Sequence, residues 1–309
     1  MELRTLPKRL KKGDTVGVIS PSSPPNQESL KKALPFLEAL GLNVKLGKSV
    51  NAVNGYLAGT DEERLADLHA MFEDPEVAGI FCAGGGYGAA RYADQIDYAM
   101  IKENPKVFWG YSDITFLHTA IGEYAEMVTF HGPMLASDVG KPEFHERSRR
   151  MFGLLFAPFE LHYTEEVAPL ETLVGGVAQG ELVGGNLSLI RSAIGTKFDL
   201  DVKGKILLIE DIDEEPAEVD EILNHLRMAR KFDEAAGIVI GDFKNAEPKK
   251  RNPSLSLEQV LTDYFSGLNI PVVKGFKIGH CEPHFSVPLG TLARLDAEAK
   301  TLTILPGVE

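Results

Sequence analysis

A serine that follows an expected strand is the first residue whose type and position suggest chemistry. Residues 106–110 form an apolar run typical of a buried strand, and a helical pattern begins near Ile114. Ser112 lies in the turn between them, where a hydroxyl stands clear of the sheet, beside helix N–H groups that can stabilise an oxyanion. The spacing predicts a nucleophile elbow, although Ile114 stands where that motif has a small residue. Ser112 or Asp113 as a helix N-cap is the simpler alternative, and it stays open.

A glycine-rich loop follows the preceding expected strand. Residues 84–88 read Gly-Gly-Gly-Tyr-Gly directly after the apolar run 77–82. Glycines allow backbone N–H groups to approach a ligand closely. The loop is therefore interpreted as half of an oxyanion hole facing Ser112, as a phosphate cradle that lacks the usual lysine, or as a tight turn.

A serine nucleophile needs a base, usually a histidine that a carboxylate orients. Glu210 and His280 both come at the ends of expected strands, where catalytic groups of α/β proteins collect. With Ser112 they give the order nucleophile, acid, base. His131 also follows a strand and is a second candidate to line a site, whereas His118 is expected to point away from the hydroxyl. The alternative for Glu210 is a solvated acidic loop.

Two rival sites involve the segment around His280. His280, Cys281 and His284 resemble a metal-binding cluster, but Pro283 prevents the helix that would place both histidines on one face. Cys281 as a nucleophile is disfavoured, because adjacent side chains of an extended segment point to opposite sides. No metal and no organic cofactor are expected.

Alternating strands and helices must position these residues. Apolar runs at 15–20, 42–46, 77–82 and 106–110 alternate with helical patterns, which predicts βαβ units and a mostly parallel sheet. We expect an N-terminal α/β domain over 1–140, an inter-domain connection over 141–174, and a C-terminal domain over 175–309. The second half holds buried strands at 205–209, 237–241 and 271–278, a helix over 219–228 and a hairpin over 293–305.

Composition limits the class of protein and its partners. The 309 residues carry 32 Lys and Arg against 45 Asp and Glu, a net charge of −13, which disfavours nucleic acid and anionic membranes. Two cysteines give no disulfide framework, and neither a secretory signal nor a membrane-length apolar run is found. We therefore expect a cytoplasmic protein.

Several motifs in a fixed order resemble the LD-carboxypeptidase family of serine peptidases, from about Lys12 to Leu305. The resemblance rests on residues 85–88 (Gly-Gly-Tyr-Gly), 110–113 (Gly-Tyr-Ser-Asp), 184–187 (Gly-Gly-Asn-Leu), 208–211 (Leu-Ile-Glu-Asp), and 279–280 (Gly-His) with 288–290 (Pro-Leu-Gly). It implies an N-terminal α/β domain similar to the class I glutamine amidotransferases and a smaller C-terminal domain rich in β structure. A homodimer is a family-level expectation.

The resemblance also implies a Ser–His–Glu triad that spans both domains. Ser112 would be the nucleophile, His280 the general base and Glu210 its orienter. The backbone N–H groups of Gly85 and Asp113 would form the oxyanion hole. Further substrate contacts are expected from the residues Gly86, Tyr87, Arg91 and Asn186, with Arg91 a candidate for the substrate carboxylate.

The implied reaction is hydrolysis of the L,D-peptide bond to a terminal D-amino acid in a small murein tetrapeptide, as in cell-wall recycling. The family also contains microcin C self-immunity proteins, amidases that cleave a peptidyl-nucleotide and stack its adenine on a Trp. Trp109 is the only Trp here and is expected to be buried, which weakens that alternative. A silent muropeptide-binding protein is the third hypothesis. Two departures from the family pattern are Gly84, where relatives often carry Arg, and His284, where many carry Asn.

Overall fold

The structure, a computed structural model, describes residues 4–309, which divide into two compact units. The first unit contains residues 4–159, Glu282–Gly290 and Pro306–Glu309, and the second contains Glu160–Cys281 and Thr291–Leu305. The chain therefore leaves the second unit directly after Cys281, returns at Thr291, and ends in the first unit.

The first unit is built on a six-stranded sheet in the order β12-β5-β4-β3-β1-β2. Its strands are β1 (Thr15–Ile19), β2 (Asn43–Leu46), β3 (Val77–Cys82), β4 (Val107–Gly110), β5 (Thr129–His131) and β12 (Val287–Leu289). All neighbours are parallel except β12, which pairs antiparallel with β5. The parallel sheet expected of the N-terminal half is confirmed.

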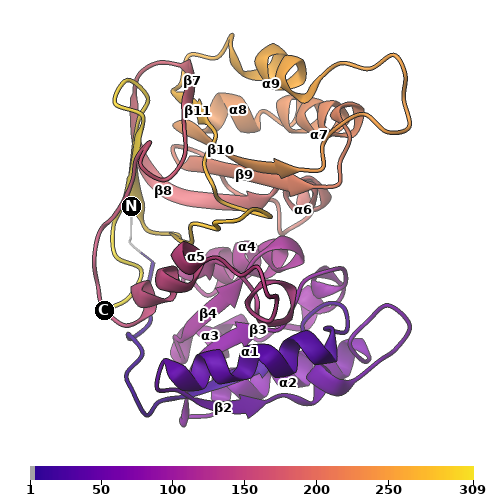
Figure 1. Cartoon of the computed structure of the whole chain (residues 1–309), viewed down its shortest axis with the longest axis vertical. Coiled ribbons are helices and arrows are strands. Elements are labelled where there is room, and N and C mark those ends of the chain that lie inside the picture. Colours follow the sequence, from indigo (N-terminus) through magenta and orange to yellow (C-terminus); the bar gives the residue numbers. More distant parts are fainter. Residues whose placement is uncertain (1–3) are drawn as a thin grey trace. The chain divides into compact units, whose positions relative to one another are not determined.

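Helices cover both faces of this sheet (Figure 1). They are α1 (Gln27–Ala39), η1 (Lys48–Asn51), α2 (Asp61–Glu73), η2 (Ala89–Gln95), α3 (Tyr98–Glu103), η3 (Ser112–Ile114), α4 (Thr115–Tyr124), η4 (Leu135–Val139), α5 (Glu146–Arg150) and η5 (Met151–Leu155). Alternation along β4 separates the two faces: Phe108 packs in the core under α2, α3 and α4, whereas Trp109 contacts Phe152 on the other face. Phe152 in turn packs edge-to-face on Phe36 of α1.

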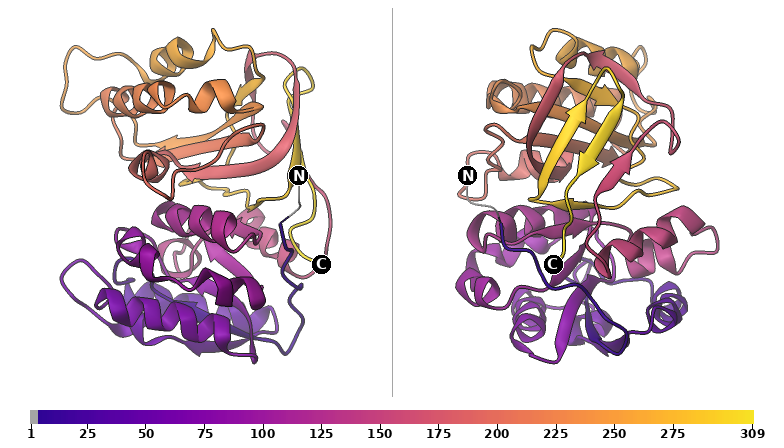
Figure 2. Two further views of the ribbon diagram at one scale, coloured as in Figure 1. Left: turned by 180° about the vertical axis from the view of Figure 1, so that it is seen from behind. Right: turned by 90° about the vertical axis from the view of Figure 1, so that its left-hand side faces the viewer.

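The second unit holds an eight-stranded mixed sheet in the order β6-β14-β13-β8-β9-β10-β11-β7. Its strands are β6 (Leu161–Tyr163), β7 (Glu171–Val174), β8 (Val177–Asn186), β9 (Ile206–Ile212), β10 (Gly237–Lys244), β11 (Val272–Lys274), β13 (Leu292–Asp296) and β14 (Thr301–Ile304). The long β8 pairs antiparallel with β13 over its first half and parallel with β9 over its second half. One strand therefore joins an antiparallel section, which includes the expected C-terminal hairpin (Figure 2, right), to a parallel one.

Four helices accompany the parallel section: α6 (Leu187–Ala193), α7 (Pro216–Met228), α8 (Lys231–Glu234) and α9 (Leu257–Phe265). Their apolar residues share one buried cluster with those of β8, β9, β10 and β11. The unit is thus rich in β structure, as expected, but its centre is again α/β. The strand expected over 271–278 is shorter, because Gly275 adopts a φ of 99° after Lys274.

No helix in the described part, residues 4–309, is both long enough and apolar enough to cross a membrane.

Candidate functional site

Ser112 occupies the turn between β4 and α4 in the first unit. Its φ is 63°, in the left-handed region that a non-glycine residue adopts only at a cost of about 1–3 kcal/mol. The residue starts the short helix η3, which continues directly into α4, and its side chain is half-buried. A strained serine between a parallel strand and a helix is the geometry of a nucleophile elbow. The strand–turn–helix expected around Ser112 is therefore present.

The glycine loop lies beside this turn. A Cβ atom added at Gly85 would be 3.0 Å from Ser112 Cβ and 3.2 Å from Ser112 Oγ. A Cβ at Gly86, whose φ is 103°, would be 2.4 Å from Ser23 Oγ. Only glycine lets the loop approach so closely, and the structure thus brings Gly85 and Ser112 together.

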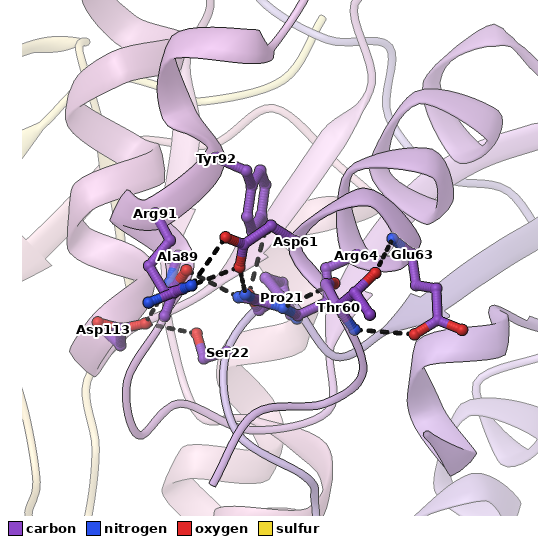
Figure 3. A network of polar contacts seen from close by, with 11 residues as sticks. Pro21, Ser22, Thr60, Asp61, Glu63, Arg64, Ala89, Arg91, Tyr92 and Asp113 are labelled. Atoms are coloured by element: carbon purple, nitrogen blue, oxygen red, sulfur yellow. Dashed lines mark hydrogen bonds and ion pairs between the residues drawn. The ribbon is translucent and has the colours of Figure 1, made fainter. Parts of the chain in front are cut away.

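The carboxylate of Asp113 connects this turn to two loops. It accepts hydrogen bonds from Ser22 Oγ at 2.6 Å and from the Ala89 N–H at 2.9 Å (Figure 3). Burial raises the pKa of Asp113, and these hydrogen bonds oppose that shift. From the sequence, Asp113 is expected to act through its backbone N–H or as a helix N-cap, but the N-cap residues of η3 and α4 are Tyr111 and Ile114. The Ser22 partner was not predicted, because the two residues lie 91 positions apart.

The first unit contains three buried histidines near the Ser112 turn, His118, His131 and His284. His118 donates from Nε2 to the Gly110 carbonyl at 2.8 Å. Burial lowers its pKa to about 3, so the ring is neutral at neutral pH. His131 and His284 are both buried, with 3.3 Å between His131 Nδ1 and His284 Nε2, and both rings contact the Tyr111 ring edge-to-face. His284, which stands where many relatives carry Asn, therefore packs against Tyr111, the residue before Ser112.

In the second unit, His280 and Glu210 form a direct hydrogen bond. His280 Nδ1 lies 2.7 Å from Glu210 Oε2, and the Glu210 side chain is fully buried on β9, two residues before the strand ends at Ile212. Gly279 makes this approach possible: its φ is 121°, and a Cβ there would be 2.5 Å from Glu210 Oε2. The solvated-loop alternative for Glu210 is wrong. A buried carboxylate bound to Nδ1 leaves Nε2 as the nitrogen able to exchange a proton with a substrate.

Asp211, the next residue on β9, has a different role. It accepts hydrogen bonds from Asn186 Nδ2 at 2.8 Å and from the backbone N–H and side-chain hydroxyl of Ser188. Burial, followed by the charge of Glu210, raises its pKa to about 6. The Asn186 side chain also caps α6 by accepting from the Leu189 N–H. Asn186, predicted as a substrate contact, is thus held among structural hydrogen bonds.

The remaining predicted contact residues differ in accessibility. Tyr87 is exposed and lies with its ring centroid 6.0 Å from that of Tyr56. Arg91 makes a bidentate ion pair with Asp61, from Nε at 2.9 Å and from Nη2 at 3.0 Å (Figure 3). To bind a substrate carboxylate, Arg91 would have to share or leave Asp61.

Trp109 is fully buried, as expected, and donates from Nε1 to the Pro133 carbonyl at 2.7 Å. Cys82 is fully buried, and burial raises the pKa of its thiol. Across residues 4–309, no group of three or more His, Cys, Asp or Glu side chains is arranged to hold a metal ion.

Comparison with known proteins identifies the family. Residues 16–132 match the LD-carboxypeptidase N-terminal domain and residues 179–295 match the LD-carboxypeptidase C-terminal domain. A "Probable murein peptide carboxypeptidase" of Bacillus subtilis is 55% identical over 302 residues, which cover 98% of this chain and 95% of that protein. The chain therefore belongs to the LD-carboxypeptidase family.

Two further relatives represent the two activities named in that family. The "Murein tetrapeptide carboxypeptidase" of Pseudomonas aeruginosa is 29% identical over 289 residues, 91% of this chain and 92% of that protein. The solved structure of the microcin C7 self-immunity protein MccF, in an inactive mutant apo state, matches with a TM-score of 0.89 and 26% identity. That match covers 97% of this chain and 98% of the MccF chain.

Proposed function

We propose that this protein is a serine LD-carboxypeptidase that removes the terminal D-amino acid from murein tetrapeptides. The observation that carries the proposal is the 55% identity to the Bacillus subtilis protein over 98% of the chain. The strained Ser112 beside Gly85 and the bonded Glu210–His280 pair supply the chemistry that this activity needs.

In the proposed mechanism, Ser112 Oγ attacks the carbonyl carbon of the L-centre while His280 Nε2 takes its proton. The N–H groups of Gly85 and Asp113 hold the tetrahedral oxyanion. The C–N bond then breaks, and His280 returns the proton to the amine of the departing D-Ala. Water, activated by the same imidazole, hydrolyses the acyl-enzyme and releases the tripeptide. Glu210 holds the tautomer with the proton on Nδ1.

Chain connectivity supports a triad drawn from both units. Ser112 belongs to the first unit and His280 to the second, but the chain enters the first unit at Glu282, only two residues after His280. Glu282 is fixed there by Ser148, whose hydroxyl donates to Glu282 Oε2 at 2.6 Å. Consecutive Cα atoms are about 3.8 Å apart, so the loop that carries His280 has a short covalent tether to the unit that carries Ser112.

Substrate contacts are proposed from Gly86, Tyr87, Arg91 and Asn186. Among them Tyr87 is the best placed, because it is exposed and only two residues from Gly85. We also propose that the first domain is similar to the class I glutamine amidotransferases and that the domain bounds lie near residues 140 and 175. A cytoplasmic location and a homodimer are further proposals.

A second candidate function is cleavage of a peptidyl-nucleotide amide. It is favoured by the likeness to MccF, of which one solved structure contains aspartyl sulfamoyl adenosine. The burial of Trp109 opposes it, because no other Trp is available to stack on an adenine.

The discriminating experiment offers the purified protein three substrates: murein tetrapeptide ending in D-Ala, its epimer ending in L-Ala, and a peptidyl-nucleotide amide. We expect D-Ala release from the first only. Equal cleavage of both epimers would contradict LD specificity, and preferential cleavage of the amide would favour the second candidate. Tight binding of the tetrapeptide without product would indicate a silent binding protein.

A further inference from the structure

Arg64 is a fully buried arginine on α2, and its guanidinium lies among the loops that surround Ser112. Nη1 donates two hydrogen bonds, one to the Pro21 carbonyl at 2.8 Å (Figure 3) and one to the Gly88 carbonyl at 2.7 Å. Nη2 forms an ion pair with Asp61, and the guanidinium carbon lies 5.0 Å from the centroid of the Tyr92 ring. One side chain therefore joins helix α2 to two separate loops.

Both of these loops adjoin the proposed oxyanion hole. Gly88 closes the glycine loop that contains Gly85, and a Cβ at Gly88 would lie 2.7 Å from Arg64 Nη1. Pro21 belongs to the segment 20–23, whose Ser23 donates from its N–H to the Gly85 carbonyl at 3.1 Å. Ser23 Oγ also accepts from the Tyr87 N–H at 3.2 Å. Hydrogen bonds of the segment 20–23 therefore connect Arg64 to Gly85.

The same two loops are also bound by Asp113. Its carboxylate accepts from Ser22, next to Pro21, and from Ala89, next to Gly88. A cation and an anion therefore bind neighbouring residues of each loop: Arg64 binds the carbonyls of Pro21 and Gly88, and Asp113 binds the Ser22 hydroxyl and the Ala89 N–H. The Asp113 backbone N–H is one proposed oxyanion donor, and the Gly85 N–H is the other.

We propose that Arg64 is a positioning residue that sets the two oxyanion donors in register with Ser112. This inference rests on the proposed function. Oxyanion donors stabilise the transition state only when they already point to the place where the negative charge develops. A displaced loop therefore reduces stabilisation of the transition state more than it reduces the affinity for the substrate. Arginine suits the task because its planar, permanently charged fork presents several N–H groups at fixed angles, which a lysine does not.

The test compares Arg64→Met and Arg64→Lys with a matched control, Lys106, which precedes β4 and binds the other end of α2. Lys106 is also a buried cation, and its Nζ donates to the carbonyls of Met71 and Asp74 at the far end of α2. Lys106→Met removes a similar pair of buried hydrogen bonds without touching either loop. It should lower the Tm, as Arg64→Met does, but leave kcat within about twofold of the wild type.

For Arg64→Met we expect kcat on murein tetrapeptide to fall about 10- to 1000-fold per folded molecule, with KM nearly unchanged; complete loss of one oxyanion donor costs about 100- to 1000-fold. Arg64→Lys should recover part of kcat. Affinity for a tripeptide aldehyde, which forms an oxyanion on Ser112, should fall by about the same factor as kcat/KM. A lower Tm with kcat within twofold of the wild type in both variants would overturn the proposal.

A failure of the proposed function would be recognised separately. If the wild type releases no D-Ala, that function is wrong, and the Arg64 proposal is then tested by the rate at which a fluorophosphonate labels Ser112. This reaction needs the nucleophile and the oxyanion donors but not the murein substrate. Slower labelling in Arg64→Met than in Lys106→Met supports the positioning role, and equal rates contradict it. If Arg64→Met fails to fold, Arg64→Lys is compared in the same way.

Discussion

The two regions that carry the proposed triad are built in different ways. Around Ser112, the first unit uses backbone geometry: a serine at positive φ and a glycine loop held by the buried side chains of Arg64 and Asp113. The second unit uses one short hydrogen bond between Glu210 and His280, which Gly279 makes possible. We infer that the first region tolerates little backbone change, and that the second depends on the charge of one carboxylate.

The largest expected effect comes from removing the nucleophile. Ser112→Ala keeps the Cβ atom at the strained position, so the fold and its stability should change little. Turnover of murein tetrapeptide should fall by about 10⁴–10⁶-fold, as it does when other triads lose their serine. Steady-state kinetics, with circular dichroism as the folding control, measure this, and near wild-type turnover would remove Ser112 from the site.

A slightly smaller loss is expected in the second region. Glu210→Gln keeps the shape but removes the charge, and its amide favours the wrong tautomer of His280. The kcat should fall about 10³–10⁴-fold. Asp199→Asn is the matched control, because it removes a carboxylate charge from an ion pair with Lys231 in the same unit. Equal, small effects of both substitutions would show that the Glu210–His280 bond is structural only.

Glycine substitutions sharpen the comparison further. Gly279→Ala would place a methyl group 2.5 Å from Glu210 Oε2 and displace His280. We expect a loss of about 10²-fold in kcat, since displacements near 1 Å have effects of that size. Gly195→Ala also introduces a Cβ at positive φ, but into open space, and serves as the control for backbone strain. If both variants lose the same activity, the close approach at Gly279 is not what matters.

The smallest expected effect concerns stability and pH. Burial lowers the pKa of His118 to about 3, so between pH 6.5 and 3 the unfolded chain binds a proton that the folded protein does not. The free energy of unfolding should therefore decrease as the pH falls, by about 2 kcal/mol between pH 7 and pH 5 from this residue.

His118→Gln, which keeps a donor for the Gly110 carbonyl, should show a weaker decrease. Urea unfolding at the two pH values measures the difference. The same pH dependence in wild type and variant would show that His118 can be protonated in the folded state.

Local patterns predicted much of the fold and of the candidate site. Apolar runs ending at Gly110 and Cys82 located the strands that lead to Ser112 and to the glycine loop. Glu210 and His280 were expected at strand ends and therefore in a site; β9 continues to Ile212 and β11 ends at Lys274, yet the structure joins the two side chains by a hydrogen bond. These features could be predicted because they depend on residues close together in the sequence, or on motifs that follow one another in the same order as in the LD-carboxypeptidase family.

Contacts between distant residues were not predictable in this way. The helical pattern of α2 places Leu65, Leu68 and Met71 on the apolar face, and nothing in it shows that Arg64 is fully buried beside them. Burial of that charge requires the Pro21 and Gly88 carbonyls, which come from loops 43 and 24 residues away. The return of β12 to pair with β5 is likewise non-local, because its three residues carry no pattern that identifies a partner.

The central claim is that Ser112 forms a covalent acyl-enzyme with the peptide on the acyl side of the D-residue. Rapid acid quenching of the protein with murein tetrapeptide, followed by peptide mass spectrometry, tests it most directly. We predict an adduct with the mass of the tripeptide less one water, located on Ser112 and enriched when deacylation is slowed. An enzyme that releases D-Ala at full rate without any such adduct, or with the adduct on Cys281, would contradict the account.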